Sequence, residues 1–125
     1  MMSFLPFQNQ SKMPLVYRLG NALILPSKGP GETWGLAANE AMACGLPVIL
    51  SSKVGSAPDL VGDKGTGLVF SPGDVDAVAG YICKLQKDRA LYRQTSESAR
   101  QHIRSFSFEK LAEAIEREMQ KIAAN

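Results

Sequence analysis

The sequence predicts an α/β fold: a partial, Rossmann-like parallel sheet of three or four strands with helices on both faces and a helical C-terminal third. Short continuous apolar runs at residues 22–26 and 48–50 are typical of parallel strands that are buried on both faces, and the run at residues 66–70 predicts a short third strand. Helical patterns separate these runs, and such alternation implies parallel pairing with right-handed crossovers. From residue 74 the pattern is helical to the end. Three or four strands are too few to complete either half of a doubly wound sheet.

The chain before the first buried strand predicts an edge strand and one short helix. Residues 3–7 are apolar enough for a strand, but Pro6 restricts it to an edge or an end because proline cannot donate to a ladder. Ser11 is a good N-cap for a helix over residues 13–19.

The central helix is expected to begin near Glu32 and to end at a glycine. Gly45 supplies a left-handed stop, and Pro47 prevents the helix from continuing. A short helical turn is expected at residues 57–61, between the second and third strands.

Three polar residues predict the starts of three C-terminal helices. Asp74, Asp88 and Ser107 each precede a helical pattern and can accept hydrogen bonds from its first turn. The last helix places its larger apolar residues and one alanine on a single face: Phe108, Leu111, Ala112, Ile115, Met119 and Ile122.

Composition and charge exclude several classes of function. The chain has 125 residues, of which 45% are hydrophobic and 21% charged, and this suits one domain with one core. A formal net charge of +2 without a basic stripe argues against a nucleic-acid binder. No apolar run approaches the ~18–20 residues of a membrane span, and the N-terminus does not resemble a secretory signal. A cytoplasmic location is therefore expected.

The cysteines and the histidine form no catalytic pattern. Cys44 and Cys83 lack a CxxC spacing and are expected to be small buried hydrophobes in a reducing compartment. His102, the one histidine, lies in a polar helical stretch and is expected to be solvated. A catalytic thiol is therefore not expected.

Two carboxylates, Glu32 and Glu40, lie beside the expected start of the central helix. A wholly helical span between them would be about 12 Å long, comparable to the separation of sugar and ribose in an extended nucleotide diphosphate-sugar. The loop follows a strand, where α/β sheets bind ligands, and a helix N-terminus suits a phosphate. Gly31 and Gly35 would let the backbone approach that phosphate closely. The alternative is purely structural, because the dipole favours a glutamate near a helix start and Glu40 is a good helix former.

Several motifs in the same order resemble the group 1 family of retaining glycosyltransferases, which have the GT-B fold. The segments Glu32–Leu36 and Asn39–Ile49 resemble the E-x7-E signature of that family. The segment Val54–Asp74 looks like the motifs that follow the signature. Trp34 stands where the family usually has phenylalanine and is expected to pack beside the loop.

The resemblance implies a domain that binds a nucleotide diphosphate-sugar as the donor and helps transfer its sugar with retention of configuration. The family requires no metal ion and no cofactor, and the leaving diphosphate is thought to assist. Glu32 is the implied catalytic residue and contacts the donor sugar, whereas Glu40 binds the ribose. The implied diphosphate-binding amides are those of Thr33, Trp34, Gly35 and Leu36. By their positions in the loops, Lys28, Gly31 and Lys53 are candidates to lie near phosphate, and the alternative for each lysine is a solvated side chain.

The resemblance also implies an incomplete domain. Residues 1–125 correspond to one truncated donor-binding domain that lacks the N-terminal acceptor domain and the first half of the donor domain. The chain alone is therefore expected to be inactive. The complete enzyme is expected to transfer sugar to an acceptor that the resemblance does not specify. Whether that enzyme associates with the membrane surface is left open. If the first strand of the absent half belongs beside Phe4–Phe7, its absence leaves an edge of the sheet exposed. Such an edge is expected to pair with a second copy of the chain and form a homodimer.

Two alternatives stay open from the sequence. One is a related GT-B enzyme, such as a sugar-nucleotide epimerase or a phosphorylase-like enzyme. The other is a non-catalytic module that binds a nucleotide or takes part in assembly.

Overall fold

The sheet has three parallel strands in the computed structural model, which describes residues 2–124. The strands are β1 (Leu23–Leu25), β2 (Val48–Ser51) and β3 (Gly67–Phe70), in the spatial order β1-β2-β3. Each connection between them contains a helix, so the strands pair in parallel through crossovers. The predicted α/β class with a partial parallel sheet is confirmed.

The strand expected near the N-terminus does not form. Residues 2–9 have no regular secondary structure, and the side chains of Phe4 and Phe7 are 85% and 97% exposed. The prediction of a strand at residues 3–7 is wrong, because no strand within residues 2–124 pairs with this segment and Pro6 removes one donor. Strand β1 therefore forms one edge of the three-stranded sheet.

Burial differs between the centre and the edge of the sheet. All residues of β2 are buried, as predicted, whereas Ile24 on β1 is 41% exposed. The prediction of burial on both faces is therefore wrong for β1. The reason is that the helix on the exposed face packs against β3 and leaves β1 partly uncovered.

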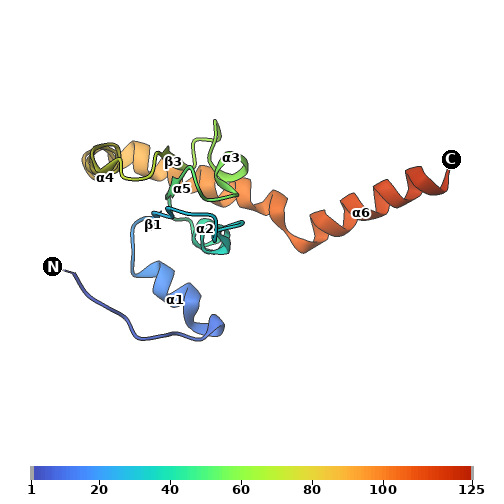
Figure 1. The fold of residues 1–125 in the computed structure, drawn as a ribbon, viewed down its shortest axis with the longest axis horizontal. Helices are drawn as coiled ribbons and strands as arrows, with labels where there is room; N and C mark the ends of the chain where they lie inside the picture. The colour runs from blue at the N-terminus through green and yellow to red at the C-terminus, as the bar shows by residue number, and fades with distance from the viewer. Residues whose placement is uncertain (1, 125) are drawn as a thin grey trace.

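Helices lie on both faces of the sheet, as predicted (Figure 1). Helix α2 (Leu36–Ala43) packs against β1 and β2 on one face, and α4 (Val75–Lys87) packs against β3 on the other. Helix α5 (Arg89–Ile103) contacts both α2 and α4. Helix α1 (Met13–Arg18) follows a 3-10 turn at Gln10–Lys12 and lies against α2.

Helix α2 begins later than the sequence predicts. Its N-cap is Gly35, whose φ of 86° is left-handed, so Glu32 lies in the preceding loop. The prediction that the helix begins near Glu32 is therefore wrong. The end of the helix is as predicted, since Gly45 has a φ of 78°.

Two short helices test other predictions. Helix α3 (Ala57–Leu60) confirms the helical turn expected between β2 and β3. Ser11 is not the N-cap of α1, because it lies inside the 3-10 turn and the cap position falls to Lys12, whose side chain makes no capping bond.

The predicted caps of the C-terminal helices are confirmed. The side chains of Asp74, Asp88 and Ser107 accept hydrogen bonds from the backbone N–H three residues further along, at 3.0, 2.9 and 3.3 Å. Helix α6 (Phe108–Ala123) extends away from the sheet and contains no buried residue (Figure 1).

The core lies between α2, the sheet and α5. Its largest fully buried side chains include Met42, Leu50 and Leu60, and Cys44 packs against the same cluster. Cys83 is exposed on α4, so its predicted burial is wrong. Within residues 2–124, no helix is both long and apolar enough to cross a membrane.

Candidate functional site

Two loops meet at the carboxyl ends of β1 and β2, where open α/β sheets bind ligands. The backbone N–H and the hydroxyl of Ser56 both donate to the carbonyl oxygen of Trp34. Gly55 permits this contact, because a Cβ there would lie 1.8 Å from the carbonyl oxygen of Thr33. A Cβ at Gly35 would lie 2.7 Å from Cγ1 of Val54. Gly55 therefore lets the two loops pack backbone against backbone, and Gly35 makes room for the side chain of Val54.

The start of α2 has the partial charge that attracts an anion. No side chain within residues 2–124 caps its first turn, and the backbone N–H groups at a helix start carry partial positive charge. Gly35 is buried and its backbone is left-handed, and the close approach of the Val54 side chain requires a residue without a Cβ at this position. Gly31 is exposed, and a Cβ on it would meet nothing within 4 Å, so no contact within residues 2–124 requires a glycine there.

Glu40 projects from α2 and is held by two side chains that are distant in sequence. The Tyr17 hydroxyl donates to Oε2 of Glu40 at 2.6 Å, and the side-chain amide of Gln10 donates to Oε1. These partners precede Glu40 by 23 and 30 positions. Sequence reasoning missed both, because no local spacing connects them with Glu40.

The Tyr17 hydroxyl remains protonated well above neutral pH. Burial raises the pKa of this phenol, and its hydrogen bond to Glu40 and the negative charge of that carboxylate raise the pKa further. Tyr17 therefore acts as a hydrogen-bond donor to Glu40 at physiological pH.

Glu32 has a different environment. Its side chain is half-buried in the loop before α2 and makes no hydrogen bond or ion pair with any residue in the range 2–124. Lys28 and Lys53 are exposed in the loops that follow β1 and β2, and neither forms an ion pair within the same range. The structure thus brings these candidate residues to one end of the sheet without joining them to one another.

The side chain of Trp34 contacts α2 and the 3-10 turn at Arg104–Phe106 that follows α5. Its indole N–H donates to Oδ1 of Asn39 at 2.9 Å, and its ring lies 6.3 Å from the ring of Phe106. Phe106 also contacts His102, whose Nε2 is 2.8 Å from the carbonyl oxygen of Asp59. The prediction of a merely solvated His102 is wrong, because the residue is half-buried and links the end of α5 to α3.

Comparison with known proteins identifies the family. The model of the family "Glycosyl transferases group 1" matches residues 1–102. The chain belongs to the group 1 glycosyltransferases. It is 32% identical over 112 residues to a D-inositol 3-phosphate glycosyltransferase of Saccharomonospora viridis, covering 90% of this chain and 25% of that protein.

Other group 1 relatives agree with this assignment. An O-antigen chain mannosyltransferase B of Escherichia coli is 33% identical over 106 residues, covering 85% of this chain and 26% of its own length. The structure of a sucrose-phosphate synthase from Thermosynechococcus elongatus superposes with a TM-score of 0.79 at 31% identity, covering 98% of this chain and 30% of that one. The chain therefore spans about a quarter of the length of the D-inositol 3-phosphate glycosyltransferase and of the O-antigen chain mannosyltransferase B.

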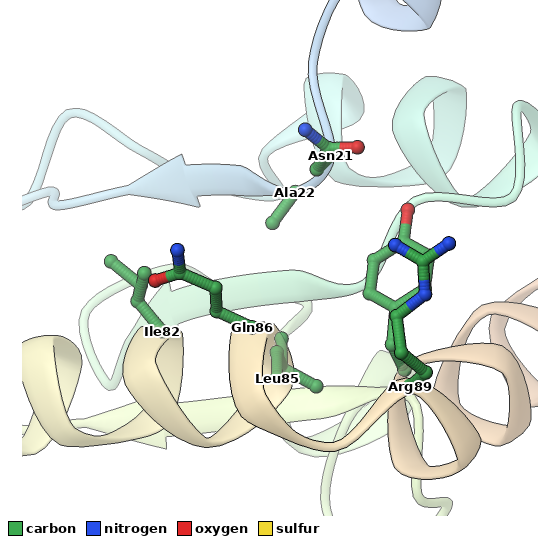
Figure 2. Close-up of a pocket in the computed structure, with 7 residues that line it drawn as sticks. Asn21, Ala22, Ile82, Leu85, Gln86 and Arg89 are labelled. Atoms are coloured by element: carbon green, nitrogen blue, oxygen red, sulfur yellow. The ribbon is translucent and has the colours of Figure 1, made fainter.

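A cavity of about 360 Å³ lies elsewhere on this group 1 domain (Figure 2). It is bounded by the amino end of β1, α4 and the start of α5, so it opens at the opposite end of β1 from the Glu32 loop. It is lined by Asn21, Ala22, Ile82, Leu85, Gln86, Arg89 and Tyr92. Because ligands of open α/β sheets bind outside the carboxyl ends of the strands, this cavity is separate from the candidate site.

Proposed function

We propose that the chain is the donor-binding part of a retaining glycosyltransferase that uses a nucleotide diphosphate-sugar. The observation that carries the proposal is the uncapped start of α2, with a carboxylate on each side of it and loops that meet there. Membership of the group 1 family supports sugar transfer as the activity of the complete enzyme.

In this proposal the diphosphate lies against the backbone N–H groups of Thr33–Leu36. These groups and the helix dipole stabilise negative charge without a metal ion. Lys28 and Lys53 are exposed near the same end of the sheet and can add positive charge. The same stabilisation favours departure of the nucleoside diphosphate when the glycosidic bond breaks.

The two carboxylates have separate tasks in the proposed complex. Each carboxylate offers several acceptor positions and so suits vicinal hydroxyls. Glu40 accepts hydrogen bonds from the ribose, and Glu32 accepts them from the transferred sugar. Contacts that orient the sugar contribute to the rate as well as to binding, so we assign the catalytic role to Glu32.

We further propose that transfer requires regions that lie outside the matched segment of the relatives. The relatives are much longer than this chain, which covers only 25% and 26% of two of them. In our proposal the acceptor and part of the donor are bound by those regions, and the isolated chain binds donor without transferring sugar.

Binding to the isolated chain is tested by titration with UDP-, GDP- and ADP-sugars. Trp34 is the single tryptophan and lies in the site, so its fluorescence reports on ligand there. We expect one nucleotide class to bind with a Kd near or below about 1 mM, equivalent to about 4 kcal/mol, and Glu40→Gln to weaken it.

A matched control is Glu113→Gln on α6, an exposed glutamate remote from the site. It removes the same charge and should leave binding unchanged. Absence of any response to all three donors, or equal losses in the two variants, would contradict the proposal.

A further inference from the structure

The contact between Tyr17 and Glu40 joins a buried ring to a site residue. Tyr17 is only 8% exposed and belongs to the hydrophobic core cluster, so its ring has a fixed position between α1 and α2. From this position its hydroxyl reaches Oε2 of Glu40 at 2.6 Å. The core therefore determines where one oxygen of this carboxylate lies.

The other oxygen of Glu40 has a different kind of partner. Oε1 accepts from the side-chain amide of Gln10, a residue that is exposed in the 3-10 turn before α1. An exposed amide is easily replaced by water or by a ligand hydroxyl, whereas a buried phenol is not. The two oxygens of Glu40 are thus unequal: Oε2 is held from the core, and Oε1 faces a replaceable donor.

We propose that Tyr17 is a positioning residue for the nucleotide ribose: it holds Oε2 of Glu40 so that Oε1 accepts from a ribose hydroxyl, which takes the place of the Gln10 amide. This inference rests on the proposed function, in which Glu40 binds the ribose. Pre-organisation of the carboxylate reduces the entropy that ligand binding must remove. The raised pKa of Tyr17 keeps its proton available for this task throughout the physiological range.

A purely structural role would have a different consequence. A hydrogen bond that only ties α1 to α2 would affect the stability of the chain and would weaken all ligands alike. A positioning role acts only on ligands that have ribose hydroxyls, and only when Glu40 is present. The ratio of affinities for ribose and dideoxyribose nucleotides separates the two roles.

The experiment compares a nucleoside diphosphate with its 2′,3′-dideoxy analogue by isothermal titration calorimetry. The base is the one among uracil, guanine and adenine that the unmodified 125-residue chain binds most tightly. Tyr17→Phe, which retains the ring, should weaken the ribose form about tenfold, as loss of one hydrogen bond at a charged group predicts. It should leave the affinity for the dideoxy form unchanged.

Two further variants complete the test. In a Glu40→Gln background, Tyr17→Phe should have a much smaller additional effect, because contacting residues couple. Gln10→Ala, at the exposed partner of the other oxygen, should bind the ribose form as tightly as the unmodified chain or more tightly. Circular dichroism of each variant verifies the fold, and Gln10→Ala tests the inference even if Tyr17→Phe does not fold.

The outcomes separate this inference from the proposed function. If the unmodified chain binds no nucleotide, the proposed function fails and the inference fails with it. If the chain binds nucleotide but Tyr17→Phe weakens both forms equally, or neither, only the positioning role is overturned. A tenfold loss in Gln10→Ala would overturn the exchange of Gln10 for a ribose hydroxyl.

Discussion

The loop that carries Glu32 and the helix that carries Glu40 differ in how firmly they hold their carboxylates. Glu40 lies on α2, and both its oxygens accept hydrogen bonds, one of them from a core tyrosine. Glu32 lies before the helix, and its side chain has no hydrogen-bond partner within residues 2–124. One carboxylate is therefore positioned before ligand binds, and we expect the other to be positioned by the ligand itself.

The largest expected effect distinguishes the two carboxylates by kinetics. In the complete enzyme to which we propose this chain belongs, Glu32→Gln should lower kcat by about a hundredfold, the scale reported for loss of one transition-state contact. Glu40→Gln should mainly raise KM for the donor, by about tenfold, as expected for one hydrogen bond to a charged group. Initial-rate kinetics over a range of donor concentrations measure both, and unchanged parameters in both variants would refute the assignment.

The second prediction disturbs the Glu32 loop and leaves the contacts of Glu40 in place. Gly55→Ala introduces a Cβ at 1.8 Å from the Thr33 carbonyl oxygen, so the two loops must separate. We expect a loss of about 2–3 kcal/mol in the free energy of unfolding, the upper part of the range for overpacking.

The control for this loop is Gly31→Ala, where a Cβ meets nothing within 4 Å. Its effect should stay within about 0.5 kcal/mol, as for other exposed positions. Urea denaturation measures both variants. Similar stability of the two would show that the contact between the loops is not tight.

The third prediction tests the Glu40 side through alkaline pH. The folded-state pKa of Tyr17 is raised above the unfolded value of about 10. The stability that this shift contributes is complete below pH about 10 and is lost as the pH rises through the folded-state pKa. Tyr17→Phe should cost about 1 kcal/mol at neutral pH and show a smaller loss of stability above pH 10 than the unmodified chain.

Denaturation curves from neutral to alkaline pH measure this difference. The pKa of Tyr81 is also raised by burial, but that residue is present in both proteins and its contribution cancels in the comparison. Parallel pH profiles for the two proteins would argue against a buried Tyr17 hydroxyl.

The smallest expected effect concerns the support of Trp34. Asn39→Ala removes the acceptor of the indole N–H, an exposed hydrogen bond of 2.9 Å. We expect a loss of about 0.5–1 kcal/mol and a change in tryptophan emission, with the Phe106 contact retained. An emission spectrum identical to that of the unmodified chain would contradict this arrangement.

Local chemistry made much of the fold predictable from the sequence. The caps at Asp74, Asp88 and Ser107 act within one helical turn, and the stop at Gly45 depends on a single residue. The apolar runs of β2 and β3 correspond to strands whose partners are neighbours in the order of the chain. Such features require no knowledge of distant contacts.

The features that were missed depend on distant contacts. Helix α2 begins after Gly35, whose left-handed backbone packs against the side chain of Val54, and Glu40 is held by Tyr17. The environment of Trp34 includes Phe106, from the 3-10 turn at Arg104–Phe106 that follows α5. Even the exposure of Ile24 depends on how far the helix on that face extends. Pattern and propensity describe none of these relations, although the family resemblance had identified the site segment itself.

The most direct test of the proposed donor site is the location of nucleotide binding on the unmodified chain. Assigned ¹H–¹⁵N NMR spectra recorded during titration with UDP, GDP and ADP provide this location residue by residue. We predict that one of them shifts the amide signals of Thr33–Leu36 and Glu40 and leaves those around the Figure 2 cavity, such as Gln86 and Arg89, in place. Shifts confined to the cavity, or no shifts with any of the three nucleotides, would contradict a donor site at the start of α2.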